Sequence, residues 1–205
     1  MECPHPSGFH VEVRERYVAA VAEVTRLVRA VPEDGWTAPT PCRDWDVHTL
    51  MNHLAAQHLW VCQAVAGYTP EAIGHRFGGD VLGRNPAGVW AMAADTAVRA
   101  LHQPGAPDLL VHLPYGVRDA GGYARELTAE TVVHGWDLAR ALGENGRIPS
   151  DSARYALEEF QGYHDLTGTG LFDPPLASAP GADTQDRLLA LTGRDPNWSY
   201  DSTMH

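Results

Sequence analysis

The segment from Arg125 to Leu142, RELTAETVVHGWDLARAL, contains two residues whose types and spacing could bind a metal. Glu130 and His134 are four residues apart, so they lie one turn from each other on one face of an α-helix. A carboxylate and an imidazole at this spacing can both reach a single ion. The same spacing also fits an ordinary exposed Glu/His pair on another face of the helix. The other residues of the metal-binding face are apolar or small: Leu127, Thr131, Leu138 and Ala141.

A second predicted helix adds a third possible ligand. The segment from Asp46 to Ala66, DVHTLMNHLAAQHLWVCQAVA, has helical periodicity, with Asp46 as the expected N-cap. His53 lies on its inward stripe; a single histidine there is more often a hydrogen-bonded core residue than a ligand. Two helices that each place such a side chain inward are, however, typical of metal sites in helix bundles. His53, Glu130 and His134 would leave a fourth position open, as catalytic zinc sites do.

Two segments resemble the DinB-like superfamily, and most of all its branch that includes the mycothiol-dependent maleylpyruvate isomerases. They are TPCRDWDVHTLMNHLA (40–55) and ETVVHGWDLARALG (130–143). GDVLGRNPAGVW (79–90) and DTQDRLLALTGRDP (183–196) extend the resemblance over nearly the whole chain. The resemblance implies metal ligands in an HLA segment and in a Glu-x-x-x-His pair, here His53, Glu130 and His134. It also implies an all-α fold, a DinB-like four-helix bundle, to which this chain adds short C-terminal helices.

The resemblance further implies zinc, with mycothiol as the expected co-substrate. The same ligand types also fit Fe²⁺ or Ni²⁺ as alternative ions. The isomerases carry a separate C-terminal domain that helps to hold the thiol, and we expect none in a chain of this length. In the family an arginine near the C-terminus is suspected of contacting the acidic end of the thiol. Arg187, on the last predicted helix, is the candidate for that role.

Several reactions fit this ligand set. A thiol coordinated to the metal loses its proton and can add to an electrophilic small molecule. Release of the thiol after rotation about the new single bond gives a cis–trans isomerase, whereas retention of the adduct gives an S-transferase. The same ligands also fit a non-haem Fe(II) oxygen-dependent enzyme or a zinc-water hydrolase. A non-catalytic module that binds a metal or a small molecule is the remaining alternative.

Composition limits the partners and the compartment. The 205 residues, 44% of them hydrophobic, predict one domain, with a core at 11–145 and a C-terminal extension at 146–205. A net charge of −11 argues against nucleic acid or an anionic membrane as a partner. No apolar run approaches the ~18 residues of a membrane span, and no signal peptide is visible. Three cysteines without a CxxC pair suggest a reducing compartment, so we expect a cytoplasmic protein. The oligomeric state is left open between monomer and homodimer.

The remaining elements follow from periodicity and turn residues. Helices are predicted at 13–31, 85–103, 150–164 and 183–191, with a β-like run at 108–114. The glycine-rich connection 67–85 is predicted to be irregular, with His75 and Arg76 facing the entrance to the site. Three minor hypotheses concern single residues near the site: His112 as a fourth ligand, Asp137 as a partner of His53 or a loop cap, and Cys42 as a thiol whose pKa is lowered by Arg43.

Overall fold

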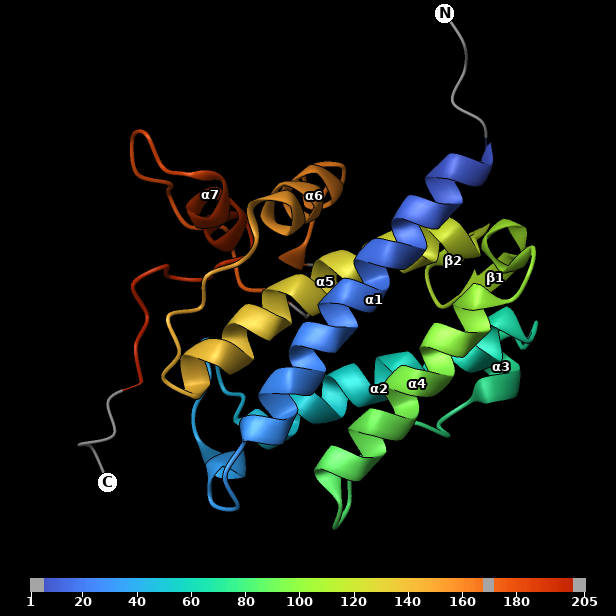
Figure 1. The fold of residues 1–205 in the computed structure, drawn as a ribbon, viewed down its shortest axis with the longest axis horizontal. Helices are drawn as coiled ribbons and strands as arrows, with labels where there is room; N and C mark the ends of the chain where they lie inside the picture. The colour runs from blue at the N-terminus through green and yellow to red at the C-terminus, as the bar shows by residue number, and fades with distance from the viewer. Residues whose placement is uncertain (1–5, 168–171, 201–205) are drawn as a thin grey trace, which may run out of the picture. The chain divides into compact units, whose positions relative to one another are not determined.

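The computed structural model describes residues 6–167 and 172–200, with side chains from Val11 onward. Within these residues the chain is mostly helical, with seven α-helices and a single two-stranded sheet (Figure 1). This confirms the predicted all-α, DinB-like fold class. None of the described helices is both long and apolar enough to cross a lipid bilayer. The helices are α1 (Pro6–Ala30), α2 (Val47–Val65), α3 (Pro70–Ile73), α4 (Pro86–His102), α5 (Ala120–Ala141), α6 (Ser150–Gln161) and α7 (Thr184–Leu191).

The contacts divide the chain into two compact units. The first unit contains residues 1–25 and 51–128, and the second contains residues 26–50 and 129–205. Helices α1, α2 and α5 contribute residues to both. The expected single domain, with a core and an extension that meet after residue 145, stays a prediction.

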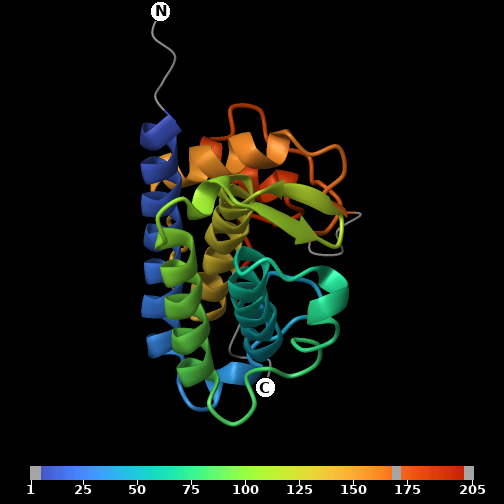
Figure 2. The same ribbon diagram turned by 90° about the vertical axis from the view of Figure 1, so that its right-hand side faces the viewer.

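In the first unit, α1, α2 and α4 pack around the imidazole of His58. The ring of His58 stacks on Tyr17 of α1 at 5.7 Å and meets Trp90 of α4 edge-on at 4.9 Å. Trp90 Nε1 also donates a hydrogen bond to Thr25 Oγ1 at 3.0 Å, which joins α4 to α1. Helices α1 and α4 therefore lie side by side (Figure 2).

The helix starts show which sequence signals are reliable. Asp46 and Asn85 cap α2 and α4 as predicted, because their side chains accept hydrogen bonds from Thr49 N and Gly88 N. Helix α5 begins at Ala120, five residues before the predicted start at Arg125. Asp119 Oδ1 caps this extra turn by accepting from the Gly122 amide at 2.7 Å. Helix-disfavouring glycines at 121–122 hid that turn from a periodicity argument.

A β-hairpin precedes α5, where the sequence predicted a β-like run. Strand β1 (Leu110–Leu113) pairs antiparallel with β2 (Gly116–Asp119). Glu126 of α5 anchors the hairpin, since its carboxylate accepts hydrogen bonds from Tyr115 Oη at 2.7 Å and Arg118 Nη1 at 2.5 Å. The connection 67–85 is less irregular than predicted, because it contains α3, which the Thr69 side chain caps. Both the hairpin and α3 lie near the C-terminal end of α2 (Figure 2).

In the second unit, the C-terminal half of α5 packs against α6 and α7. Leu157 and Phe160 of α6, together with Leu188 and Leu189 of α7, are buried with Val133 of α5 in one apolar cluster. Burial of aliphatic and aromatic side chains in such a cluster is the main source of stability. The cluster therefore holds the C-terminal helices on the helix that carries Glu130 and His134.

Candidate metal centre

The two ligand candidates on α5 are both buried. His134 is 0% exposed and Glu130 is 5% exposed. They lie one turn apart on the same helix, as their spacing predicted. The alternative of an exposed Glu/His pair on another face of the helix is therefore excluded.

His134 is oriented by a carboxylate on the next turn of α5. Its Nδ1 lies 3.0 Å from Oδ2 of Asp137, which is fully buried. We expected Asp137 to be a partner of His53 or a loop cap; it is instead the partner of His134. Residues three apart on a helix are neighbours on its surface, so the pair forms within α5 itself.

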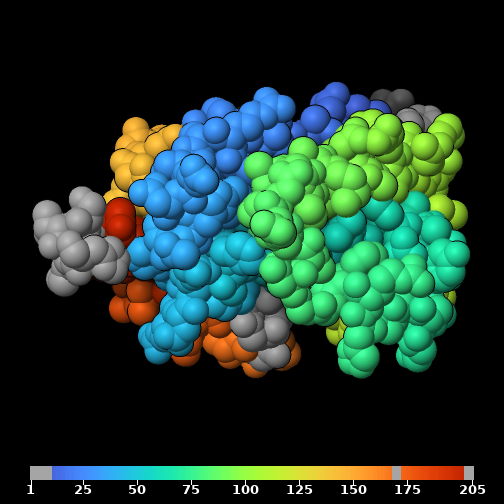
Figure 3. All heavy atoms as spheres, turned by 90° about the horizontal axis from the view of Figure 1, so that it is seen from below, coloured from blue at the N-terminus to red at the C-terminus, as the bar shows by residue number. Residues whose placement is uncertain are grey.

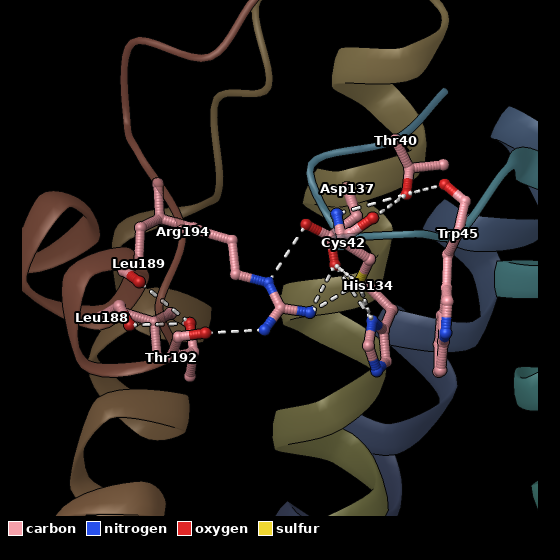
Figure 4. Close-up of polar contacts among 9 residues, drawn as sticks. All are labelled: Thr40, Cys42, Trp45, His134, Asp137, Leu188, Leu189, Thr192 and Arg194. Carbon is pink, nitrogen blue, oxygen red and sulfur yellow. Dashed lines mark hydrogen bonds and ion pairs between the residues drawn. The ribbon is translucent and has the colours of Figure 1, made fainter. Parts of the chain in front are cut away.

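Asp137 is held in its ionised form by Arg194. The guanidinium makes two contacts with the carboxylate, Nε to Oδ1 at 3.3 Å and Nη2 to Oδ2 at 3.0 Å (Figure 4). Burial by itself would raise the pKa of Asp137, but Arg194 and the hydrogen bond from His134 outweigh it and lower this pKa to about 2. Arg194 is itself buried, and its Nη1 donates to the carbonyl of Thr192 at 2.6 Å.

These contacts determine the protonation of His134. Burial lowers its pKa, although the bond to Asp137 opposes that shift. The imidazole is therefore neutral at pH 7. An ionised carboxylate can only accept, so the single ring proton lies on Nδ1 and the lone pair on Nε2. A neutral imidazole with one nitrogen held in this way is the form that binds metals.

Cys42 belongs to the same cluster. Its thiol donates to Asp137 Oδ2 at 3.2 Å, and Arg194 Nη2 donates to its sulfur at 2.7 Å. Burial, followed by the charge of Asp137, raises the pKa of Cys42 above its usual range. The expectation that Arg43 would lower it is wrong, because the Arg43 side chain is exposed and reaches Asp173 instead.

Two aromatic rings flank His134. The centroid of the Trp45 ring lies 6.0 Å from that of the imidazole, and the two rings stack. The Phe172 ring is nearly parallel to the imidazole, with 5.8 Å between the centroids. The guanidinium of Arg194 also lies over the Phe172 ring at 4.9 Å. The rings therefore exclude water from the His134 imidazole and the Arg194 guanidinium, which strengthens the contacts of both groups with Asp137.

Three of these groups are close enough to contact one ion. Ligand atoms of Cys42, His134 and Asp137 all lie within 4.8 Å of one another. A thiol sulfur, an imidazole nitrogen and a carboxylate oxygen are all common metal ligands. A metal could thus approach His134 from the Nδ1 side as well as from the Nε2 side.

The other predicted site residues lie elsewhere. His53 is half-buried on α2 in the first unit, whereas Glu130 and His134 belong to the second. The set of His53, Glu130 and His134 therefore stays a prediction. Arg187 is exposed on α7, and His112 is exposed on β1; their roles as thiol contact and fourth ligand also stay predictions.

Sequence reasoning missed Arg194 altogether. It stands in the segment LTGRDP, after the end of α7, and nothing in that pattern marks it as buried. The available signal was indirect. A carboxylate on the inward side of a helix needs a cation, and because the chain has no lysine, an arginine is the expected source.

Comparison with known proteins identifies the family to which the chain is similar. The family model described as "Mycothiol maleylpyruvate isomerase N-terminal domain" matches residues 17–139, more than half of the chain. The chain is 25% identical over 199 residues to uncharacterized protein Rv0738 of Mycobacterium tuberculosis strain ATCC 25618 / H37Rv. It matches uncharacterized protein MT0763 of strain CDC 1551 / Oshkosh equally well. Each match covers 92% of this chain and 97% of the relative. No solved structure gives a significant match.

Proposed function

The chain belongs to the mycothiol maleylpyruvate isomerase N-terminal domain family, and on that premise we propose that it is a metal-dependent, thiol-using enzyme. A divalent ion would be held by His53, Glu130 and His134. Zinc is the preferred ion, and Fe²⁺ and Ni²⁺ are the alternatives. The co-substrate would be a low-molecular-weight thiol, mycothiol, which adds to an electrophilic small molecule. The reaction would be a cis–trans isomerisation or an S-transfer.

One observation carries the ligand assignment. The His134 Nδ1–Asp137 Oδ2 bond of 3.0 Å leaves the lone pair of the imidazole on Nε2. Histidine ligands usually donate their second N–H to a carboxylate in this way, which fixes the ring and makes it more basic. Glu130, buried one turn before His134, supplies a carboxylate at the spacing that a shared ion needs.

The alternative set of Cys42, His134 Nδ1 and Asp137 is less favourable. An ion there would displace the Nδ1 proton from its bond to Asp137. It would also meet the positive charge of Arg194, whose Nη2 lies 2.7 Å from Cys42 Sγ and 3.0 Å from Asp137 Oδ2. The guanidinium already supplies the counter-charge, so we assign this cluster the role of orienting His134.

The chemistry then divides between the ion and the chain. A divalent ion bound here would lower the pKa of a thiol that coordinates it, which produces a nucleophile at neutral pH. Asp137 holds the proton on Nδ1 of His134, and Arg194 keeps Asp137 ionised. Trp45 and Phe172 exclude water from the sides of the imidazole.

Metal analysis of protein purified without a polyhistidine tag or added metal tests the ligand set. We expect near-stoichiometric zinc in the native protein and none in His134→Ala. The matched control is His102→Ala, which removes an exposed histidine of α4 and should leave the zinc content unchanged. Asp137→Asn should weaken zinc binding about 10–100-fold, since it removes the charge that orients His134. Full metal retention in His134→Ala would refute the ligand set.

Activity assays test the reaction. With mycothiol present, the zinc protein should isomerise maleylpyruvate or transfer the thiol to an electrophile, and His134→Ala should do neither. Turnover that needs oxygen would point to the Fe(II) alternative, and turnover without thiol to the hydrolase. A metal-loaded protein without turnover in any of these assays would leave the binding module in place of the proposed enzyme.

A further inference from the structure

The first unit contains a pocket of about 360 Å³. Its walls come from α2, from residues 74–78 after α3, from the turn of the β-hairpin, and from Tyr123 of α5. Residues 74–76 and 78 are exposed, so this side of the pocket is at the molecular surface (Figure 3). A cavity of this volume is large enough for a small organic molecule.

Four large aromatic side chains contribute to the walls of the pocket. Trp60, Phe77, Tyr115 and Tyr123 all line it. Aromatic rings favour planar, apolar ligands, which they contact by stacking or edge-to-face packing. The hydroxyl of Tyr115 is already committed to Glu126 at 2.7 Å, so this residue offers its ring to a ligand.

The pocket offers no arginine or lysine to an anionic ligand. None of the described residues that line it is a cation of that kind, and the chain contains no lysine. The nearby Arg76 donates to Gln63 Oε1 at 2.9 Å, and Arg118 is paired with Glu126. Among the described lining residues only the imidazole of His75 could pair with a carboxylate, and no permanent cation would compensate for its lost hydration, so a neutral ligand is favoured.

The polar part of the wall favours a ligand that carries a hydrogen-bond acceptor. Gln57 and Trp60, both from α2, line the pocket. Trp60 Nε1 is buried and has no acceptor among the described residues. Because a buried donor without a partner is costly, a ligand whose carbonyl or nitro oxygen displaces the wall enough to reach Trp60 Nε1 would remove that cost.

The position of the pocket along α2 connects it with the proposed reaction. Gln57 and Trp60 follow His53 by four and seven residues, so the three lie on one face of the helix. We propose that the pocket binds the electrophilic substrate, and that this substrate is a neutral, planar aromatic molecule with a carbonyl or nitro group. The assignment of the occupant as an electrophile rests on the proposed function.

One reaction of this class is the attack of the thiol on 1-chloro-2,4-dinitrobenzene. The thiol proton goes to solvent and a carbon–sulfur bond forms. The carbon–chlorine bond then breaks, and chloride leaves with the electron pair. This substitution needs no oxidant or reductant.

Calorimetric titration of the full chain with 2,4-dinitrotoluene, an unreactive neutral analogue, tests the pocket directly. We expect saturable binding of this probe and no measurable binding of maleate, a small dianion. Phe77→Ala should weaken binding of the probe about tenfold or more, and Trp60→Phe, which keeps a ring but removes the N–H, about threefold. Tyr68→Ala is the control, because Tyr68 is an exposed aromatic residue of the same connection that does not line the pocket.

The outcomes separate this proposal from the proposed function. Binding of dinitrotoluene that persists in His134→Ala supports the pocket whether or not the protein turns over a thiol. Tighter binding of maleate than of dinitrotoluene, or equal losses in Phe77→Ala and Tyr68→Ala, would overturn it. Mycothiol-dependent isomerisation of maleylpyruvate without any binding of dinitrotoluene would refute the substrate class and leave the proposed function intact.

Discussion

Arg194 and Asp137 form a buried two-contact ion pair although 57 residues separate them in sequence. Their side chains are 2% and 0% exposed. Asp137 in turn binds Nδ1 of His134. Arg194, which follows α7, therefore keeps Asp137 ionised and, through Asp137, determines the orientation and protonation of His134 on α5.

Removal of Arg194 should strongly destabilise the protein. Arg194→Met would leave the Asp137 carboxylate buried without its cation, at a cost of about 3–5 kcal/mol in the free energy of unfolding. The exposed pair of Arg147 and Asp183, 3.6 Å apart, provides a control. Arg147→Met should change stability by less than about 0.5 kcal/mol. Urea unfolding of both variants measures the difference, and a loss below about 1 kcal/mol in Arg194→Met would contradict the buried-pair interpretation.

Stability should fall in mild acid because of His58. Its burial in the first unit lowers its pKa from 6.5 to about 4, although its bond to the Leu54 carbonyl opposes the shift. The unfolded chain therefore binds more protons than the folded protein below pH 6.5. The contribution of neutral His58 to the free energy of unfolding is fully present above pH 6.5 and is lost progressively as the pH falls towards 4. About 2 kcal/mol of it is lost by pH 5.

A pair of glutamine variants isolates this effect. His58→Gln should reduce the difference in urea stability between pH 7 and pH 5 by about 2 kcal/mol. His102→Gln should not, although His102 makes the same kind of bond, from Nδ1 to the Val98 carbonyl at 2.8 Å, because His102 is exposed. The same pH dependence in His58→Gln as in the native protein would show that another group is responsible.

Two glycines after α5 should respond differently to alanine. Gly143 and Gly146 both have positive φ, +75° and +64°. A Cβ at Gly143 would meet nothing within 4 Å, whereas at Gly146 it would lie 2.7 Å from both Arg140 Cδ and Trp136 Nε1. Gly143→Ala should thus cost about 1 kcal/mol from backbone strain, and Gly146→Ala at least about 2 kcal/mol because overpacking adds to that strain. Equal shifts of the urea midpoint would argue against the close contact at Gly146.

Much of the fold could be predicted because its signals are local. Apolar periodicity and the capping side chains of Asp46 and Asn85 identify α2 and α4 almost to the residue. The four-residue spacing of Glu130 and His134 placed both on one face of α5 for the same reason, since a helix repeats every 3.6 residues. Where local signals are weak, as in the first turn of α5 and in α3, the predicted boundaries were wrong.

The surroundings of His134 were decided by tertiary structure. The spacing of Glu130 and His134 predicted that a carboxylate and a histidine would share one helical face, and their burial was established by the structure. The sequence by itself did not determine that Cys42, 92 residues earlier, and Arg194, near the other end of the chain, would form a cluster with His134 and Asp137. Helix spacing repeats along the chain, so it can be read from neighbouring residues. A buried charge, in contrast, is stabilised by whichever opposite charge the packing of distant segments brings within a few ångströms of it.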